Sequence, residues 1–294
     1  MEMSKRNYYQ SQLSSNSHDP RKTRKLKNSL IKGKEKGLTP PDEQINPVNQ
    51  QPTNDPTHMA SIFNDYFVSI GNRLAIAIIS PANKKYPVSC HGPQRSFVLH
   101  EATSEEVKII INNLRVSKSV RMNDIPIHIL KICKQILSPF LAQLFNRCVK
   151  SGIYSECLKC AQAIPIHKGG RKNHCTNYRP ISLLSPFNTI FEKLIYTRLY
   201  SYVEQNKMLS DSQYGFRSGL STSVAIYDIH ENLFKNREEK YTTCAIFCDV
   251  SKAFDTIDHN MLLHKLEHFY GIRGIPLKLL TNYLQDRQQY TVVE

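Results

Sequence analysis

The chain has no long apolar run. Its longest uninterrupted stretch, Leu74 to Ile79, is far shorter than the roughly 20 residues that a membrane-spanning helix needs. No apolar segment follows Met1, so the sequence shows no signal peptide, and no internal repeat is found. These absences predict a soluble chain inside the cell, in the nucleus or the cytoplasm.

Acidic residues are also scarce. The 294 residues include 25 Asp and Glu against 39 Lys and Arg, a formal net charge of +14. A surface of this sign commonly attracts a polyphosphate such as nucleic acid, although a solvated basic surface or an anionic membrane are alternatives. Part of the charge lies near the N-terminus, where only Glu35 opposes a basic group: Arg21, Lys22, Arg24, Lys25, Lys27, Lys32, Lys34 and Lys36.

The cysteines are best interpreted as small apolar side chains, because disulfides are rare inside cells. Four of them fall on apolar faces: Cys133, Cys148, Cys244 and Cys248. A second interpretation exists for one set with the superficial spacing of a zinc site: Cys157, Cys160, His167, His174 and Cys175. No second cysteine pair has finger spacing, so zinc is the weaker hypothesis.

The N-terminal half divides near residue 57. Residues 1–57 are rich in Ser, Asn, Gln, Lys and Pro without a sustained period, which predicts a basic, disordered linker. From Met59 to Ile70 apolar residues recur at helical spacing, and Gly71 is expected to end that helix. Residues 58–155 are therefore predicted to form a helical N-terminal extension.

Three more helices are predicted in this extension. Thr103 and Glu106 form a capping-box signature before an apolar stripe. A helix is expected over 125–137 with Pro126 in its first turn, and another from Ser138-Pro139 onward.

Residues 156–294 have a mixed pattern, so we predict an α+β chain. The run 161–168 is typical of a strand, and a second apolar strand leads into Asp249. The chain ends on the beginning of a further strand at Tyr290, with no partner strand after it. Helices are expected over these ranges: 188–203, 222–235, 260–270 and 276–285.

The most informative stretch is CAIFCDVSKAFDTIDH, residues 244–259. Its apolar run predicts a strand with both faces covered, so that Asp249 is presented where the sheet ends. Asp255 follows six residues later. The alternative is that Asp249 caps the turn and Asp255 caps the helix that begins near His259, since both are common uses of Asp.

This stretch resembles the first catalytic motif of reverse transcriptases, as found in non-LTR (LINE-type, jockey-like) retrotransposons. The matching residues are Asp249, Lys252, Ala253, Phe254, Asp255, Thr256, Asp258 and His259. Two more blocks of that family occur upstream in the expected order, at 177–199 and 213–222. Weaker similarity runs back through 163–168 to about Met59 and forward through 283–293.

The resemblance implies a fold, an activity and partners. The expected fold is a helical extension followed, over 156–294, by the fingers and the first part of the palm of a right-hand polymerase. The activity would be DNA synthesis on an RNA template by two-metal nucleotidyl transfer with Mg²⁺. The partners would be an RNA template, a DNA primer or RNA–DNA hybrid, and deoxynucleoside triphosphates.

Roles for the residues of the motif follow from the same resemblance. Asp249 would bind Mg²⁺ together with the backbone carbonyl of Val250. Phe254 matches the bulky aromatic under the incoming sugar, which excludes a ribose 2′-hydroxyl, although it is alternatively a core residue at a turn. Asp255 is a second catalytic candidate and has no sure role beyond bracing the loop.

The upstream blocks supply the candidate binding residues. Lys168 and Arg179 match basic positions that the family places on the triphosphate, with Arg179 in an Asn-Tyr-Arg-Pro turn. Solvated surface charge is the alternative, most strongly for Lys168. Phe216 and Arg217 resemble template contacts, in which a ring stacks on a base and a guanidinium holds a backbone phosphate.

Two departures from the family pattern stand out. The family favours a glycine-containing turn near 118–126, where this chain has Val120, Arg121 and Met122, so we expect another loop shape or strain. The larger departure is the second carboxylate source, an aromatic-x-Asp-Asp hairpin, because no Asp-Asp pair occurs in the 294 residues. The sequence therefore predicts a reverse transcriptase truncated within the palm and inactive as it stands. The alternatives are a non-enzymatic nucleic-acid-binding remnant and a gene remnant without a stable fold.

Overall fold

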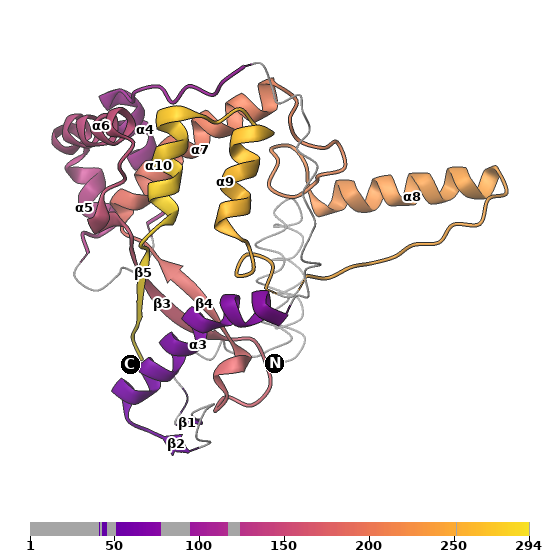
Figure 1. Cartoon of the computed structure of the whole chain (residues 1–294), viewed down its shortest axis with the longest axis horizontal. Coiled ribbons are helices and arrows are strands. Elements are labelled where there is room, and N and C mark those ends of the chain that lie inside the picture. Colours follow the sequence, from indigo (N-terminus) through magenta and orange to yellow (C-terminus); the bar gives the residue numbers. More distant parts are fainter. Residues whose placement is uncertain are drawn as a thin grey trace, which may run out of the picture.

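The computed structural model of the chain describes residues 41, 43–45, 51–77, 95–116, 124–250 and 252–293 (Figure 1). Groups of helices stand between short strands, a mixture that agrees with the predicted α+β class. The strands are β1 (Gln44–Ile45), β2 (Pro52–Thr53), β3 (Cys160–His167), β4 (Tyr178–Leu183) and β5 (Gln288–Thr291). The α-helices are α3 (Pro56–Ala77), α4 (Ser104–Asn113), α5 (Ile127–Ile132), α6 (Lys134–Ser151), α7 (Pro186–Gln205), α8 (Thr222–Glu238), α9 (His259–His268) and α10 (Gly274–Leu284), and the 3-10 turns are η1 (Glu156–Leu158) and η2 (Cys175–Asn177).

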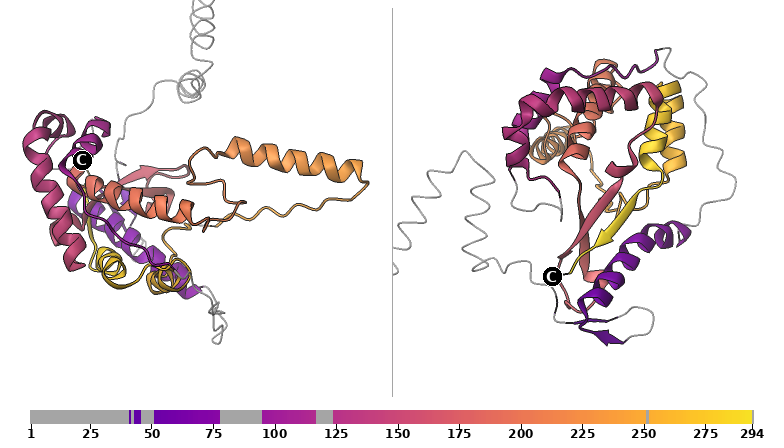
Figure 2. Two further views of the ribbon diagram at one scale, coloured as in Figure 1. Left: turned by 90° about the horizontal axis from the view of Figure 1, so that it is seen from above. Right: turned by 90° about the vertical axis from the view of Figure 1, so that its left-hand side faces the viewer.

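A three-stranded sheet of order β4-β3-β5 lies between α3 and the larger group of helices (Figure 2). β3 and β4 are antiparallel, while β3 and β5 are parallel, with Cys160 opposite Gln288. The predicted strand at 161–168 is thus confirmed as β3. The predicted terminal strand also forms, as β5, and its partner is a strand far earlier in the chain.

Arg179 lies in β4, opposite Ile166, so its predicted position in a turn is wrong. Pro180, opposite Pro165, does not end the strand, because β4 is an edge strand that tolerates a missing N–H. The register continues regularly through both prolines.

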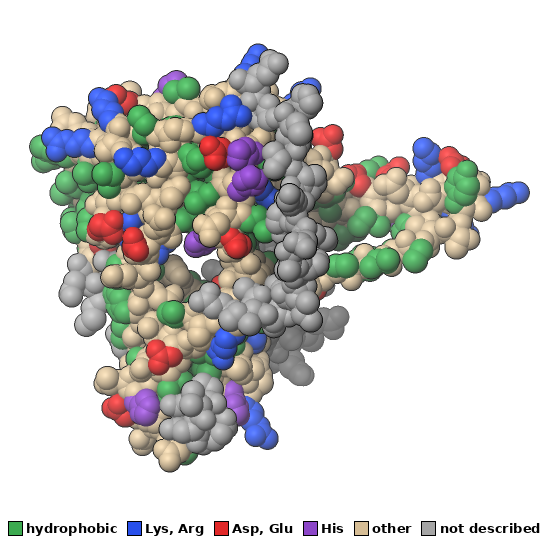
Figure 3. All heavy atoms as spheres, in the orientation of Figure 1, with side chains coloured by type: hydrophobic (Ala, Val, Ile, Leu, Met, Phe, Trp, Pro, Cys, Tyr) green, Lys and Arg blue, Asp and Glu red, His purple; other side chains and the backbone are tan. Residues whose placement is uncertain are grey.

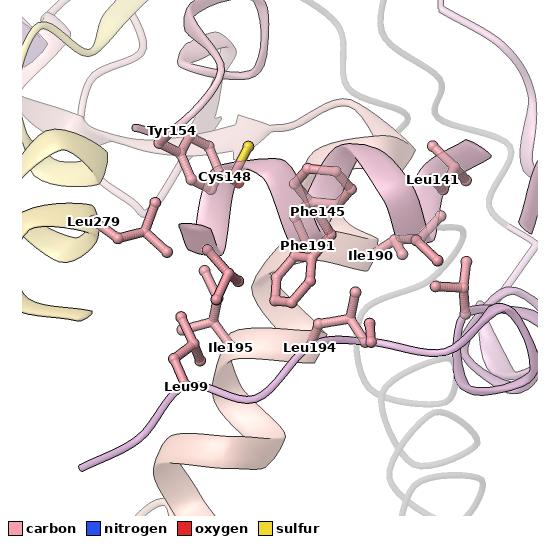
Figure 4. Packing of buried hydrophobic residues seen from close by; sticks show 14 of the residues in the cluster. Leu99, Leu141, Phe145, Cys148, Tyr154, Ile190, Phe191, Leu194, Ile195 and Leu279 are labelled. Atoms are coloured by element: carbon pink, nitrogen blue, oxygen red, sulfur yellow. The ribbon is translucent and has the colours of Figure 1, made fainter. Parts of the chain in front are cut away.

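The largest core is formed by α4, α6, α7 and α10 (Figure 4). Phe145 of α6 meets Phe191 of α7 edge to face with ring centroids 5.4 Å apart, and Tyr154 contacts Phe191 in the same way. The apolar stripes of these helices therefore supply the core, although Phe140 and Leu144 of the α6 stripe are exposed. Residues on both sides of position 155 contribute to this one cluster.

A smaller core joins α3 to the sheet. Phe63 is fully buried and packs edge to face on Tyr178 of β4, with ring centroids 4.8 Å apart. Ala163 of β3 and Cys175 of η2 complete the contact. This second cluster attaches the first described long helix to the hairpin β3–β4.

Two helix boundaries differ from prediction. α3 continues past Gly71 to Ala77, because Gly71 is tolerated within the helix, where its missing Cβ leaves room for the backbone carbonyl of Asp255. The helix predicted over 125–137 is shorter, because α5 ends at Ile132 and α6 already begins at Lys134. α6 contains Pro139, which therefore does not start a new helix. The Ser138 hydroxyl donates to the Lys134 carbonyl at 2.6 Å, one turn earlier.

Other boundaries agree with prediction or cannot be compared. α4 begins at the predicted cap, where Thr103 accepts from the Glu106 amide, and α7 to α10 match the four later helices. Most of the predicted linker and the altered loop residues Val120, Arg121 and Met122 lie outside the described residues. β1 and β2 do fall within the predicted linker, and Gln44 is fully buried, donating to the Lys172 carbonyl at 2.7 Å.

The predicted strand over 244–249 does not form. Residues 241–250 have no regular secondary structure and are exposed throughout, including Cys244 and Cys248, which were expected to be buried. A strand covered on both faces needs flanking strands, and neither described sheet pairs with this segment. Cys148 is buried as expected, and Cys133 is half-buried.

Candidate functional site

The turn between β3 and β4, together with the first residues of β4, carries a group of exposed basic side chains, which we call the basic turn: Lys168, Arg171, Lys172 and Arg179. The Lys168 amide donates to the Asn177 carbonyl at 2.9 Å, so the ladder continues one step beyond β3. Since Ile166 lies opposite Arg179, Lys168 and Arg179 are diagonal neighbours on the same face of the hairpin. The structure therefore brings the two predicted triphosphate-binding residues together.

Two glycines shape this turn. Gly169 and Gly170 both have positive φ, +128° and +82°, a backbone conformation that favours glycine. The side chain of Asn177 braces the turn by donating to the Arg171 carbonyl at 2.9 Å. The backbone that carries the basic side chains is therefore held in place by a side-chain hydrogen bond.

Phe216 lies in the irregular segment between α7 and α8. It has a positive φ of 64° and is 84% exposed, unusual for a large aromatic residue. Its ring meets the ring of Phe254 edge to face with centroids 6.0 Å apart, and Phe254 is itself 74% exposed. The predicted template-stacking ring and the predicted sugar-contacting ring are thus neighbours, although they are far apart in sequence.

Arg217, in contrast, is engaged within the protein. Its guanidinium donates to both carboxylate oxygens of Glu204, at 3.1 and 3.2 Å, and to the Ser210 carbonyl at 3.0 Å. The hydrogen bonds from Arg217 lower the pKa of Glu204 below its usual value of 4.5. A template phosphate would have to compete with this pairing.

Asp249 and Val250 lie at the end of the exposed segment 241–250, where it comes back toward the body of the molecule from the far end of α8 (Figure 1). Both side chains are exposed. The sequence prediction that Asp249 follows a buried strand is therefore not met, although Asp249 remains accessible to a ligand.

The loop that follows is attached to α3. Lys252 has a positive φ of 51°, and its ammonium donates to the Tyr66 hydroxyl at 3.0 Å while lying 4.6 Å from the ring centroid. The Asp255 amide donates to the Lys252 carbonyl at 2.9 Å and closes the turn. The cap of α9 is Asp258, which accepts from the Met261 amide at 2.9 Å, so Asp255 does not cap that helix.

The sequence did not reveal the role of Tyr66. Its position in a helical apolar stripe correctly predicted a buried ring, which is 6% exposed. Its hydroxyl nevertheless reaches a loop 186 positions away, and Arg73 lies over the same ring at 5.3 Å. No local pattern signals a contact of this range.

The described oxygen donors do not complete a two-metal site. Asp249 and the Val250 carbonyl suit Mg²⁺ chemically, since hard cations prefer oxygen ligands. Within the described ranges, however, no three His, Cys, Asp or Glu side chains converge to hold an ion. Asp249 can supply one carboxylate, and a two-metal mechanism requires others.

The zinc hypothesis gains no support in the same ranges. Cys157 is exposed, with its sulfur 3.0 Å from the Ser155 hydroxyl, whereas Cys175 is buried. Burial raises the pKa of the Cys175 thiol, which disfavours the thiolate that binds zinc.

Burial likewise raises the pKa of Cys148 and of the phenols Tyr154 and Tyr283, so these groups stay neutral at physiological pH.

Comparison with known proteins agrees with the motifs. Residues 166–293 match the family model described as reverse transcriptase (RNA-dependent DNA polymerase). A probable RNA-directed DNA polymerase from transposon BS of Drosophila melanogaster is 29% identical over 201 residues, covering 66% of this chain and 21% of that protein. The RNA-directed DNA polymerase from mobile element jockey of the same species is 30% identical over 178 residues, covering 60% and 19%.

Over residues 166–293 the chain is therefore similar in sequence to reverse transcriptases. The curated proteins that it resembles are those of jockey-like non-LTR retrotransposons. The chain spans about a fifth of the length of the first two relatives. None of its described helices is both long and apolar enough to cross a membrane.

Proposed function

We propose that the chain provides the nucleotide-binding and template-binding part of an RNA-directed DNA polymerase from a jockey-like element. Its ligands would be an RNA template, a DNA primer or RNA–DNA hybrid, and deoxynucleoside triphosphates. The observation that carries the proposal is the contact between Phe216 and Phe254, which joins two sequence blocks with different predicted ligands. In this proposal β3 and β4 belong to the fingers, and residues from Asp249 onward begin the palm.

The basic and the aromatic side chains bind different ligands in this proposal. Lys168 and Arg179 hold the triphosphate, with Arg179 suited to bidentate contact. Phe216 offers an exposed face on which a template base stacks, and Phe254 lies beneath the incoming sugar. Arg217 helps to hold the Phe216 turn through Glu204, so its own contact with template would be secondary.

The proposed chemistry is incomplete in these 294 residues. Asp249 and the Val250 carbonyl would be ligands for Mg²⁺, which stabilises the entering and leaving oxygens in this class of reaction. Asp255 would position the loop rather than bind metal, since its amide closes the turn at Lys252. Because no Asp-Asp pair is present, we expect binding without sustained synthesis.

A primer-extension assay with an RNA template, a DNA primer, deoxynucleotides and Mg²⁺ tests this proposal. The 294-residue chain should bind the hybrid but add no nucleotides. Template-dependent synthesis that disappears in Asp249→Ala would show that the expected inactivity is wrong. Failure to bind either hybrid or nucleotide would contradict the polymerase assignment itself.

The second candidate is a nucleic-acid-binding protein without chemistry. It is favoured by the exposed basic turn together with the absence of a converging metal-ligand cluster in the described residues. A nucleotide-binding measurement separates the two. Specific affinity for deoxynucleoside triphosphates, weakened by Arg179→Ala, supports the polymerase part, whereas hybrid binding alone supports the second candidate.

A further inference from the structure

The strand β1 contacts the loop between β3 and β4, at the end of the hairpin that carries the basic turn (Figure 1). Gln44 is fully buried, and its amide nitrogen Nε2 donates to the Lys172 carbonyl at 2.7 Å. The backbone amide of Ile45 donates to the Asn173 carbonyl at 2.8 Å, and Ile45 forms a parallel bridge with His174. Two neighbouring residues of β1 thus hold two neighbouring carbonyls of the loop. We call these two bonds the β1 contact.

The Lys172 carbonyl has a second donor. The Tyr178 hydroxyl donates to it at 2.8 Å, and the Tyr178 ring packs on Phe63 of α3. β1 is also attached to α3, because Gln44 lies opposite Thr53 of β2, the strand that comes just before that helix. Both donors to this carbonyl are therefore anchored to α3.

The remaining carbonyls of the turn are engaged as well. His167 Nε2 lies 3.1 Å from the Gly170 carbonyl, and Asn177 holds the next carbonyl, as described above. The carbonyls of residues 170–173 are thus all held by groups of the protein. No backbone amide of residues 169–173 donates to another backbone group in the described part of the chain. Successive amides without an acceptor in the protein are available to bind an anion.

Stability alone does not account for a glutamine at position 44. The Oε1 atom of Gln44 is buried and has no hydrogen-bond partner among the described residues. A buried acceptor without a partner costs free energy, which offsets much of what the bond from Nε2 contributes. An apolar side chain of similar volume would fill the same space without that cost.

The location of the β1 contact suits a role in ligand binding. Lys172 belongs to the basic turn, and its side chain is exposed while its carbonyl is held inside. The loop also connects Lys168 to Arg179, the two predicted triphosphate-binding residues. A backbone that is ordered before the ligand arrives lowers the entropic cost of binding.

We propose that β1 orders the nucleotide site: the β1 contact fixes the backbone at residues 172–173, so that the basic side chains and the open amides of the turn are positioned for a triphosphate. Gln44 is a positioning residue, because it acts through the Lys172 carbonyl and does not touch the ligand. Residues 44 and 45 lie in the stretch that the sequence predicts to be a linker. Naming the triphosphate as the ligand rests on the proposed function, whereas the β1 contact can be tested without a ligand.

Gln44→Leu tests the role in binding, because it removes the donor and the unpartnered oxygen together while the Lys172 carbonyl keeps its bond from Tyr178. The affinity of the 294-residue chain for a deoxynucleoside triphosphate with Mg²⁺, measured by equilibrium dialysis, should fall about three- to tenfold, the effect of one hydrogen bond that orders a site. The midpoint of urea denaturation should stay the same.

Gln289→Leu is the matched control. Gln289 donates to Asn64 of α3 at 3.5 Å, so it also joins a strand to the N-terminal part of the chain. It lies opposite Ala161, at the end of β3 away from the basic turn. This variant should leave the affinity for the nucleotide unchanged.

A double variant tests whether the two donors act on the same carbonyl. Tyr178→Phe keeps the ring on Phe63 and removes only the hydroxyl. In Gln44→Leu combined with Tyr178→Phe, the Lys172 carbonyl has neither side-chain donor. The loss of affinity should therefore exceed the product of the two single losses, because either donor alone can hold the carbonyl. A loss equal to that product would contradict a shared action on the turn.

Limited digestion with trypsin tests the β1 contact without a ligand. Trypsin cleaves after Lys and Arg, and cleavage needs a mobile backbone. The carbonyl of the bond between Lys172 and Asn173 is the one that Gln44 holds. The initial rate of this cleavage, measured by mass spectrometry relative to cleavage after the exposed Lys240, should rise by at least about threefold in Gln44→Leu. It should not rise in Gln289→Leu.

The results separate the β1 contact from the proposed function. Faster cleavage in Gln44→Leu, without measurable nucleotide binding by the unchanged chain, would support the β1 contact and contradict the triphosphate as the ligand. Unchanged cleavage together with unchanged affinity in Gln44→Leu would overturn the proposal. A fall in affinity that is accompanied by a lower urea midpoint would also overturn it, because Gln44 would then act through the stability of the whole fold.

Discussion

Arg198 of α7 joins α4 and α6 to the part of the chain that is similar to reverse transcriptases. Its guanidinium donates to both Glu106 carboxylate oxygens, at 2.8 and 2.9 Å, and to the backbone carbonyls of His100 and Glu101, at 2.7 and 2.9 Å. It also lies over the Phe145 ring. One planar side chain thus fixes α7 against α4, the segment before α4, and α6.

Arg198→Lys should destabilise the fold despite keeping the charge, because an ammonium cannot reproduce the bidentate pair and both carbonyl bonds. We expect a loss of about 1–3 kcal/mol in the free energy of unfolding, measured by urea denaturation. Lys150→Ala, which removes an exposed ion pair with Glu101, should cost less than about 1 kcal/mol. Equal effects of the two changes would contradict the role given to Arg198.

The pair Glu204–Arg217 makes stability depend on pH. The pKa of Glu204 is lowered chiefly by its hydrogen bonds to Arg217, so its contribution is present above the usual carboxyl value of 4.5. It is lost as the pH falls through the lower folded-state pKa. In Glu204→Gln the melting temperature should therefore decrease less steeply as the pH is lowered from 7 to 3. Glu105→Gln, which changes an exposed carboxylate on α4, should leave this pH dependence unchanged.

At the scale of elements, the parts predicted well from the sequence have local signals. Thr103 caps α4 as predicted, because its side-chain oxygen reaches an amide within one turn. Ser221 and Asp258 cap α8 and α9 in the same local way, although the sequence analysis offered Asp255 as the cap of α9. The strand expected before Asp249 depends on flanking strands that no local pattern encodes. Gly71 has the local appearance of a helix stop, and only its contact with Asp255 explains its place inside α3.

The cap of α9 can be tested as an element. Asp258→Ala removes the acceptor for the Met261 amide and should lower the free energy of unfolding by about 0.5–2 kcal/mol, with increased hydrogen exchange confined to the first turn of α9. Asp258→Asn keeps an acceptor and should retain most of the stability. An Asn variant as unstable as the Ala variant would show that the carboxylate acts in some other way.

Part of the candidate site could be predicted from the sequence. It named Lys168, Arg179, Phe216 and Phe254, and the structure brings these together as two pairs of neighbours. It did not indicate that Arg217 is held by Glu204 or that Tyr66 contacts Lys252, because both contacts depend on how separate elements pack. The ordered motifs predicted the roles of these residues. Only the three-dimensional arrangement shows whether a side chain is exposed to a ligand or held by another side chain.

At the scale of the whole molecule, charge and apolar surface are separated. The basic turn lies at the β3–β4 hairpin, whereas exposed hydrophobic side chains lie along residues 222–250, which project from the body of the molecule (Figure 3). This separation predicts that nucleic acid binds at the hairpin rather than along residues 222–250. That binding should weaken steeply with salt, because it depends on phosphate contacts.

The most direct test of the proposed function is the affinity for an RNA–DNA hybrid measured as a function of salt. We predict that log affinity falls steeply with log salt concentration, and that the double variant Lys168→Ala, Arg179→Ala reduces the slope by roughly 1.5–2. Lys108→Ala on α4, away from the basic turn, should leave the slope unaltered. A chain that does not bind the hybrid, or a slope unchanged in the double variant, would contradict the account.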